Sequence, residues 1–287
     1  MNDAVVTAWA WHTPLGTGTD ALDRLNNGES PDIKRIVGEP PRHPESRYLH
    51  RAALFAWDTA CTLVPAGPLD PRLGVFTGLG GLRALWDDLG VAMMRQNAEA
   101  TDLWAHGLGK VHPYWMLRHL SNNLHARLAI RLGAAGEGTT VAGPTGGAGA
   151  LAAAIRALAV GAIDRALVVG VDTLLQPEIQ LEGEVHGRWV HGAPGEAAVA
   201  LLLSRGGSGP RVWVEGGAGS PLPAREVRRK PGPNGVLPGT ITHAMGDLGA
   251  VTSLAQIVAL LATGGVGESG GPPGLWARVH VHTEEAG

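Results

Sequence analysis

The sequence predicts an α/β protein, and the observations that support this fold class lie in one stretch, Gly138 to Asp172. Thr139 to Ala142 has β propensity, and the glycine-rich residues that follow allow a strand to reverse sharply into a helix. Ala148 to Ala159 is rich in Ala, Leu and Ile, which favours helix. Ala166 to Val171 is a continuous apolar run, typical of a strand buried on both faces of a parallel sheet. The stretch is therefore expected to form a βαβ crossover.

The turn of this crossover has the sequence GPTGGAG, and such turns have two common functional uses. A nucleotide cradle requires GxGxxG or GxxxxGK(S/T); neither pattern is present, and no lysine lies between Lys110 and Lys230 to neutralise phosphate. A nucleophile elbow holds a reactive side chain at a helix N-terminus, where the dipole lowers its pKa. That use requires Cys or Ser at the apex. The residues at the apex are instead Gly143, Pro144, Thr145, Gly146 and Gly147.

This segment resembles the nucleophile elbow of the β-ketoacyl synthases, which belong to the thiolase superfamily. A gap-free comparison aligns Arg156 in the helix, Gly161 after the helix and Asp164 before the next strand with the family pattern. Pro144 then stands where the family keeps its acyl-accepting cysteine. The resemblance implies a thiolase-like layered α/β/α/β/α fold, with the second half abbreviated in this chain.

Length and composition exclude several other classes. At 287 residues the chain is long enough to bury a substantial core. Its net charge of −3 gives no overall field that would attract nucleic acid or an anionic membrane. The single cysteine, Cys61, excludes an internal disulfide and a CxxC zinc site, and its apolar neighbours predict a buried thiol. We expect no cofactor.

The histidines do not predict a metal site. No two of the four histidines from His106 to His125 have HExxH spacing. His280 and His282 share one face of a predicted strand, but no third ligand lies in sequence reach. The N-terminus has no basic segment typical of a signal peptide, and no apolar run approaches the roughly 20 residues needed to cross a bilayer. We therefore expect a cytoplasmic protein without a membrane span.

Strands and helices are also predicted before the central stretch. Strands are expected at Val5 to Trp11 and Arg72 to Gly78, helices at Asp20 to Leu25 and Tyr48 to Val64, and a loop at Asn26 to Arg47. The second strand ends in GLGG, a weak dinucleotide signal because Arg83 stands where the last glycine of that fingerprint should be. Within Val111 to Arg131 a loop leads into a helix, with Ser121 or Asn122 as its cap.

Leu82 to His106 is predicted to be mostly helical, with an apolar face that includes Met93 and Met94. Core packing is one interpretation of this face. The alternative is a wall against a partner subunit or an acyl chain, because flexible methionine suits adaptable surfaces.

The elements after the central stretch follow the same family pattern. A polar loop is expected at Leu174 to Val190, and strands at Ala197 to Leu203, Arg211 to Glu215 and Leu275 to His282. The sequence GAPGEAAVALLLS resembles the family's glycine–glutamate motif ahead of a buried strand, with Gly195-Glu196 as the matching pair.

The resemblance is broken after residue 215. The chain has no HGTxT-like motif, and Ser220 to Pro238 is a short basic loop instead. Ile241 to Gly264 then resembles the segment that carries the family's second histidine, with Asp247 at the position of that histidine and His243 at or near the family's lysine. We therefore expect one compact domain with a ketosynthase-like N-terminal half, 1–215, and an abbreviated C-terminal half, 216–287.

The resemblance implies a subunit without condensing activity. Decarboxylative condensation needs a thiolate and donors that stabilise the enolate, and this chain lacks the cysteine and both histidines at the matching positions. Chain length factors, the non-catalytic partners of ketosynthases in type II polyketide and aryl polyene systems, share this pattern. The implied partners are a catalytic ketosynthase, in a heterodimer, and indirectly an acyl carrier protein. The cavity or interface candidates are Met93, Met94, Thr139, Thr140, Val141, Ala142 and His243.

Two alternatives stay open. One is a thiolase-fold scaffold that binds an acyl carrier protein or an acyl-CoA. The other is a divergent acyltransferase or hydrolase that uses Thr145, the hydroxyl nearest the apex.

Overall fold

The computed structural model describes residues 3–40, 42–80, 109, 111–185, 193–218, 238–271 and 275–283. The strands are β1 (Ala4–Thr13), β2 (Gly16–Thr17), β3 (Leu73–Leu79), β4 (Thr139–Ala142), β5 (Arg165–Thr173), β6 (Glu196–Ser204), β7 (Arg211–Ala218), β8 (Gly265–Gly271) and β9 (Leu275–His282). The helices are α1 (Gly18–Asn26), α2 (Arg51–Leu63), α5 (Trp115–His119), α6 (Asn123–Leu132), α7 (Gly146–Ala159), α8 (Pro177–Val185), α9 (Pro238–Met245) and α10 (Thr252–Leu260), with short 3-10 helices η1 (Pro44–Arg47) and η5 (Gly249–Val251). The predicted helix at Leu82 to His106, with Met93 and Met94, lies outside the described residues.

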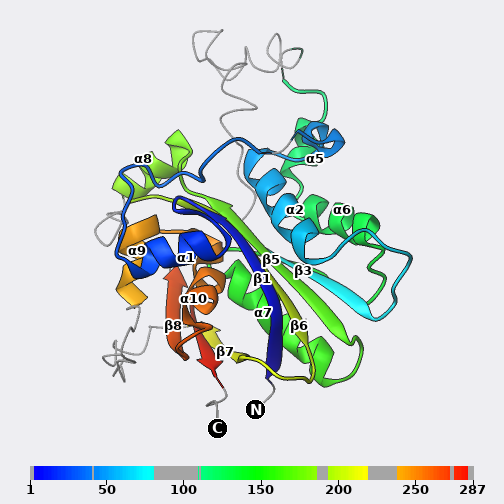
Figure 1. The fold of residues 1–287 in the computed structure, drawn as a ribbon. Helices are drawn as coiled ribbons and strands as arrows, with labels where there is room; N and C mark the ends of the chain where they lie inside the picture. Colours follow the sequence, from blue (N-terminus) through cyan, green and yellow to red (C-terminus); the bar gives the residue numbers. More distant parts are fainter. Residues whose placement is uncertain are drawn as a thin grey trace.

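All the described strands belong to one mixed sheet, in the order β4-β3-β5-β6-β1-β7-β9-β8, with β2 paired to β1 (Figure 1). β4 and β5 run parallel to β3 and pair with its opposite edges. Because α7 connects β4 to β5, the predicted βαβ crossover is confirmed. The other neighbouring strands, from β5 to β8, are antiparallel.

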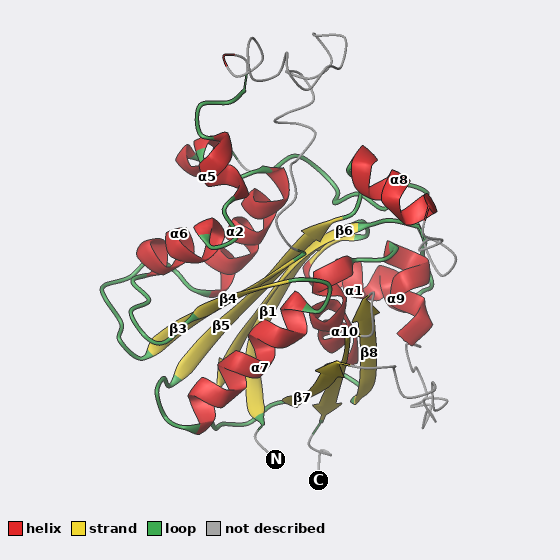
Figure 2. Cartoon of the chain, turned by 180° about the vertical axis from the view of Figure 1, so that it is seen from behind, coloured by secondary structure: helices red, strands yellow, loops and turns green. Residues whose placement is uncertain are grey.

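Two hydrophobic cores lie on opposite faces of this sheet (Figure 2). α2 and α6 pack on one face, against side chains such as Val75 and Val169. α7 and α10 pack on the other face, against Phe76 and Val168, and they also contact β7 and β9, whose Val279 belongs to the same core. Helices and strands therefore alternate in layers, and the thiolase-like α/β fold class is confirmed.

The predicted boundary between the two halves falls inside β7. This strand pairs with β1 through Arg211 and Val212, and with β9 along its whole length. The residues assigned to the two halves consequently share one sheet, and the division at residue 215 stays a prediction about sequence resemblance.

The prediction of a polar loop at Leu174 to Val190 is wrong over Pro177–Val185, where the chain forms the helix α8. Pro177 begins this helix, where its fixed φ suits a helix and its missing N–H costs nothing. Glu178 lies in the first turn, where the helix dipole favours an acidic side chain, and Ile179 is buried. The helix was missed because four of its nine residues are Glu or Gln and Gly183 is a weak helix former.

The glycine-rich strand β8 was not predicted either. Glycines are depleted in strands, so a segment reading GVGESGG gives little strand signal. At Gly267 a Cβ atom would meet Oε1 of Gln256 at 2.6 Å. The glycine is therefore required by the close packing of β8 on α10, which no local pattern reveals.

Cys61 is half-buried rather than fully buried. Burial is the largest influence on its thiol and raises the pKa, with a smaller opposing effect from Arg131. The thiol therefore stays protonated and poorly nucleophilic at neutral pH.

Two partly buried histidines connect helices to the sheet. His12 of β1 shares a hydrogen bond of 2.8 Å between its Nδ1 and Oγ1 of Thr59 in α2, and its Nε2 lies 3.5 Å from a carboxylate oxygen of Asp58. Burial lowers the pKa of His12 more than Asp58 raises it. Burial also lowers the pKa of His125 in α6, against a smaller rise from a backbone contact with Thr139.

We predict that the free energy of unfolding decreases as the pH falls from about 7.5 to about 5.5. Since the folded-state pKa values of both histidines lie below the ordinary histidine value of 6.5, the unfolded chain takes up protons in this range that the folded chain does not. Urea unfolding at several pH values measures the effect. A His12→Gln, His125→Gln double variant should show a shallower dependence on pH, and a stability that is constant or rises on acidification in the wild-type protein would contradict the prediction.

Among the described helices, none has the length and apolar character needed to span a bilayer.

Candidate functional site

The central turn has the shape of an elbow between β4 and α7. Gly143 adopts φ 129°, a conformation that side chains rarely allow. Its N–H donates to the carbonyl of Leu79 at 2.8 Å, and the N–H of Gly146 donates back to the Gly143 carbonyl at 2.9 Å. The strand ends at Ala142 and the helix begins at Gly146, so the direction of the chain reverses within three residues.

Close backbone packing holds this elbow in place. A Cβ atom on Gly78 of β3 would lie 2.5 Å from the Cα of Gly147. A Cβ atom on Gly147 would lie 2.5 Å from the carbonyl oxygen of Ala250 and 3.1 Å from Cγ of Leu254. The first turn of α7 is therefore enclosed between β3 and η5, and Gly147 has no space for a side chain.

The apex of the elbow carries Pro144 and Thr145. Pro144 is half-buried and has no thiol, hydroxyl or amine. Thr145 occupies the N-cap position of α7, and its hydroxyl makes no capping hydrogen bond. Among residues 143–147 of the turn, Thr145 has the side-chain hydroxyl, as the sequence predicts.

Asp172 is a buried carboxylate at the end of β5, and sequence reasoning used it only as a strand boundary. It is 7% exposed. One carboxylate oxygen accepts from the backbone N–H of Thr173 at 2.9 Å, and the other accepts from the N–H of Ala250 at 2.9 Å. Gly80 and Gly249 lie directly against the carboxylate, so that a side chain at either position would collide with it. Asp172 therefore anchors η5 beside the elbow.

Asp247 stands where the resemblance places the second histidine, and both its side chain and its backbone make hydrogen bonds to neighbouring backbone groups. Its carboxylate accepts from the N–H of Gly249 at 2.8 Å. Its own N–H donates to the carbonyl of Ala193 at 2.7 Å, and its carbonyl accepts from Gly195 at 2.9 Å. A histidine at this position could donate through a ring N–H, whereas the side chain of Asp247 carries two oxygens and accepts from the N–H of Gly249.

His243 lies in the last turn of α9 and is exposed. Its carbonyl, together with that of Ala244, accepts from Nζ of Lys34 at 3.1 and 3.0 Å. An exposed position is compatible with an interface, and the interface role of His243 stays a prediction.

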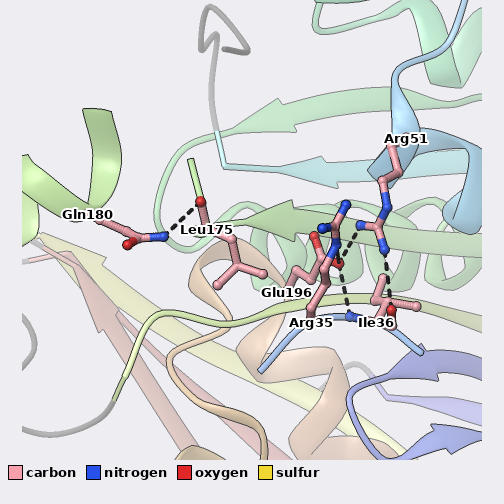
Figure 3. A network of polar contacts seen from close by, with 6 residues as sticks. All are labelled: Arg35, Ile36, Arg51, Leu175, Gln180 and Glu196. Carbon is pink, nitrogen blue, oxygen red and sulfur yellow. Dashed lines mark hydrogen bonds and ion pairs between the residues drawn. The ribbon is translucent and has the colours of Figure 1, made fainter. Parts of the chain in front are cut away.

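A buried network surrounds Glu196, the glutamate of the glycine–glutamate motif (Figure 3). Glu196 is 3% exposed. Its Oε1 accepts from Nη1 of Arg51 and from the N–H of Ile36 at 2.9 Å, while Arg35 lies 3.9 Å away. Nη2 of Arg51 also donates to the carbonyl of Ile36 at 3.2 Å. The motif thus fixes the loop around Ile36 to α2 and β6.

A small cavity opens where β3 and β5 end, beside α2 and α5. Its volume is about 60 Å³, and Leu79, Gly80, Val171 and Asp172 form its base. His50, Arg118 and His119 contribute polar walls. Typical small-molecule pockets measure about 300–1,000 Å³ and are mostly apolar. As lined by the described residues, this cavity is well below that range in volume.

The four interface candidates of β4 lie at one end of the sheet. In the described part of the chain β4 pairs with β3 only. Oγ1 of Thr140 lies 2.9 Å from Oγ1 of Thr77, Val141 packs on the core of α7, and Ala142 is exposed. Among the described strands, β4 therefore forms the edge of the sheet at this end. Among the described residues, no His, Cys, Asp or Glu side chains form a group that could hold a metal ion.

This fold and this elbow define a ketosynthase-like protein. The model of the beta-ketoacyl synthase N-terminal domain matches residues 41–187, just over half of the chain. The chain therefore belongs to the beta-ketoacyl synthase family. No curated protein matches it by sequence.

Solved structures with the same fold match the chain over nearly its whole length. The type II polyketide synthase complex AntDE:AntF, an acyl carrier protein with its ketosynthase bound to the hexaketide, gives a TM-score of 0.70 at 14% identity, covering 99% of this chain and 100% of that chain. The ishigamide ketosynthase/chain length factor gives 0.67 at 15% identity, covering 98% and 99%. The ketosynthase ApeO in complex with its chain length factor ApeC from Xenorhabdus doucetiae gives 0.66 at 15% identity, covering 99% and 98%. At these identities the likeness establishes the fold.

Proposed function

We propose that this protein is a catalytically inactive ketosynthase-like subunit, a chain length factor, which pairs with a catalytic ketosynthase and helps to shape the acyl cavity. Type II polyketide biosynthesis, in particular of aryl polyenes, is the proposed context, in the cytoplasm. The observation that carries the proposal is Pro144 at the apex of an intact elbow.

The chemistry of the site supports inactivity. Condensation begins with transfer of the acyl chain to a nucleophile at the elbow, and proline has no group that can accept it. The enolate must then be stabilised by donors, whereas Asp247 presents a carboxylate bound to the N–H of Gly249. Because the glycine packing around Gly147 preserves the shape of the elbow, the fold persists without this chemistry.

The position of β4 supports a partner. An edge strand presents unpaired N–H and C=O groups, and proteins usually cover such an edge. Two of the similar solved structures are described as pairs of a ketosynthase and a chain length factor, and a third includes an acyl carrier protein. We propose that Thr139 to Ala142 pairs with the corresponding strand of a catalytic ketosynthase, and that the acyl carrier protein interacts chiefly with that partner.

Co-expression with a catalytic ketosynthase of a type II system, followed by size exclusion and incubation with an acyl-carrier thioester, tests the proposal. We expect a one-to-one complex in which mass spectrometry finds the acyl adduct on the partner and none on this chain. Ala142→Arg should weaken the complex, because it places a charge at the edge of β4. Val160→Arg is the control, since Val160 is exposed at the other end of α7.

Two results would contradict the proposal. A monomer that never co-elutes with a ketosynthase would exclude the chain length factor. A stable adduct on Thr145 would instead support the acyltransferase or hydrolase alternative.

A further inference from the structure

The turn that ends α1 contains an asparagine followed by a glycine. Asn27 is the C-cap residue of α1, with φ −77° and ψ 0°, and Gly28 follows it with φ 77°, a value that favours glycine. Both residues are exposed. Because glycine has no side chain, nothing shields its backbone nitrogen from the side-chain amide of the preceding asparagine. The other Asn-Gly pair of the chain, Asn234-Gly235, lies outside the described residues.

Backbone hydrogen bonds close this turn as a Schellman motif. The N–H of Gly28 donates to the carbonyl of Leu25 at 3.0 Å. The N–H of Glu29 donates to the carbonyl of Arg24, also at 3.0 Å. Nε of Arg24 donates to Oε2 of Glu29 at 2.8 Å, so a side-chain pair spans the same turn. The nitrogen of Gly28 is therefore engaged in a hydrogen bond while the turn is closed.

The closed turn also keeps the side chain of Asn27 away from this nitrogen. A five-membered imide ring forms only when the Gly28 nitrogen and Cβ of Asn27 lie on the same side of the bond between Cα and the carbonyl carbon of Asn27. A ψ of 0° places the Gly28 nitrogen beside the backbone nitrogen of Asn27 instead. Ring closure consequently requires rotation about this bond, which breaks the hydrogen bond to Leu25.

We propose that Asn27 is a site of covalent modification, at which opening of the last turn of α1 leads to conversion of the asparagine to aspartate and isoaspartate. The Gly28 nitrogen attacks Cγ of Asn27, and the new N–C bond closes a succinimide ring. The C–N bond of the side-chain amide breaks, and the proton from the Gly28 nitrogen leaves with the ammonia. Water then adds to either ring carbonyl and opens the ring. The reaction needs no oxidant or cofactor, and the proposal is independent of the proposed function.

The modification weakens the end of α1 and the loop that follows it. Both products carry a carboxylate at the C-terminus of a helix, where the dipole disfavours negative charge, and Asp23 already lies in the last turn. Isoaspartate also adds a methylene group to the main chain at Asn27, which displaces the N–H groups of Gly28 and Glu29 from their acceptors. The loop continues to Lys34, whose Nζ binds two carbonyls at the end of α9, so the change reaches this contact as well.

Incubation of the folded full-length protein at mildly alkaline pH, followed by peptide mapping with mass spectrometry, tests the proposal. Chromatography separates the asparagine, aspartate and isoaspartate forms, and a synthetic peptide of residues 23–31 gives the rate without the turn. Isoaspartate should form at Asn27 in the folded protein about tenfold more slowly than in the peptide, which corresponds to about 1.4 kcal/mol for opening the turn. Both rates should rise with pH, because the Gly28 nitrogen must lose its proton to react.

Matched controls separate the chemistry of Asn27 from the effect of the turn. Asn26 is exposed in the same helix end but is followed by a residue with a side chain, so it should stay unmodified while Asn27 reacts. Asn27→Gln should give no product at this position, because its longer side chain cannot form the five-membered ring. Glu29→Gln removes the pair with Arg24, so Asn27 should react about twofold faster in the folded variant, relative to a peptide with the same substitution.

The proposal is overturned by any of three results. Absence of isoaspartate at Asn27 in the folded protein, over a time sufficient for the expected slower rate, would show that the turn does not reach the reactive geometry. A rate equal to that of the peptide would show that the turn gives no protection. Equal modification of Asn26 and Asn27 would show that Gly28 is not the source of the reactivity.

Discussion

Glu196→Gln is expected to lower the free energy of unfolding by about 3–5 kcal/mol, the usual cost of breaking a buried ion pair. The substitution keeps the size of the side chain but removes the charge that Arg51 and the N–H of Ile36 bind. Arg51, whose side chain is 18% exposed, would then hold an uncompensated charge that is largely removed from water. Chemical denaturation measures the change.

Glu29→Gln is the matched control for this prediction. Glu29 also pairs with an arginine, Arg24, at 2.8 Å, but both side chains are 44% exposed. Exposed pairs contribute about 0–1 kcal/mol, so the control should be nearly neutral. If both variants lost the same small amount of stability, the Glu196 network would not hold the loop around Ile36 to α2 and β6.

Gly147→Ala is the second substitution with a large expected effect. The added methyl group would lie 2.5 Å from the carbonyl oxygen of Ala250, which belongs to the backbone of η5 and cannot rotate away. We expect a loss of about 3 kcal/mol or more in the free energy of unfolding, at the upper end of the range for overpacked cores. The elbow should distort as well, so the variant should form less of the complex with a ketosynthase.

Gly206→Ala provides the control. A Cβ atom on Gly206 would have open space around it, with no contact within 4 Å, and this glycine does not adopt a positive φ. The same substitution there should change stability by about 0.5 kcal/mol or less. Equal effects at Gly147 and Gly206 would contradict the packing that encloses the elbow.

The sequence pattern predicts most of the described elements because their signals are local. Apolar runs identify β5 and β6, and glycine turn chemistry identifies the elbow at Gly143. The resemblance to the family places Pro144 and Asp247 at the altered positions. The helix α8 and the strand β8 do not follow from local composition, since the first mixes Glu and Gln with proline and glycine and the second is rich in glycine.

The candidate site is predictable in part only. The elbow and Glu196 are found from sequence, but the anchoring role of Asp172 depends on the N–H of Ala250, which is 78 residues away along the chain. Asp172 lies at the end of an apolar run, where the sequence shows only the boundary of a strand. The fold brings η5 to the end of β5 beside α7, and this places the N–H of Ala250 at the carboxylate of Asp172.

The sequence alone determined that this chain is an α/β protein with a ketosynthase-like elbow that has Pro144 at its apex, because strand and helix periodicity, turn glycines and the identity of Pro144 are properties of short segments. Only the tertiary structure decided which residues hold the elbow and which strands end the described sheet. Gly147 meets Ala250, Glu196 meets Arg51, and β8 ends the described sheet through contacts between segments far apart in the sequence. The physical reason is that packing and hydrogen bonding depend on distance in space, which composition and periodicity do not record.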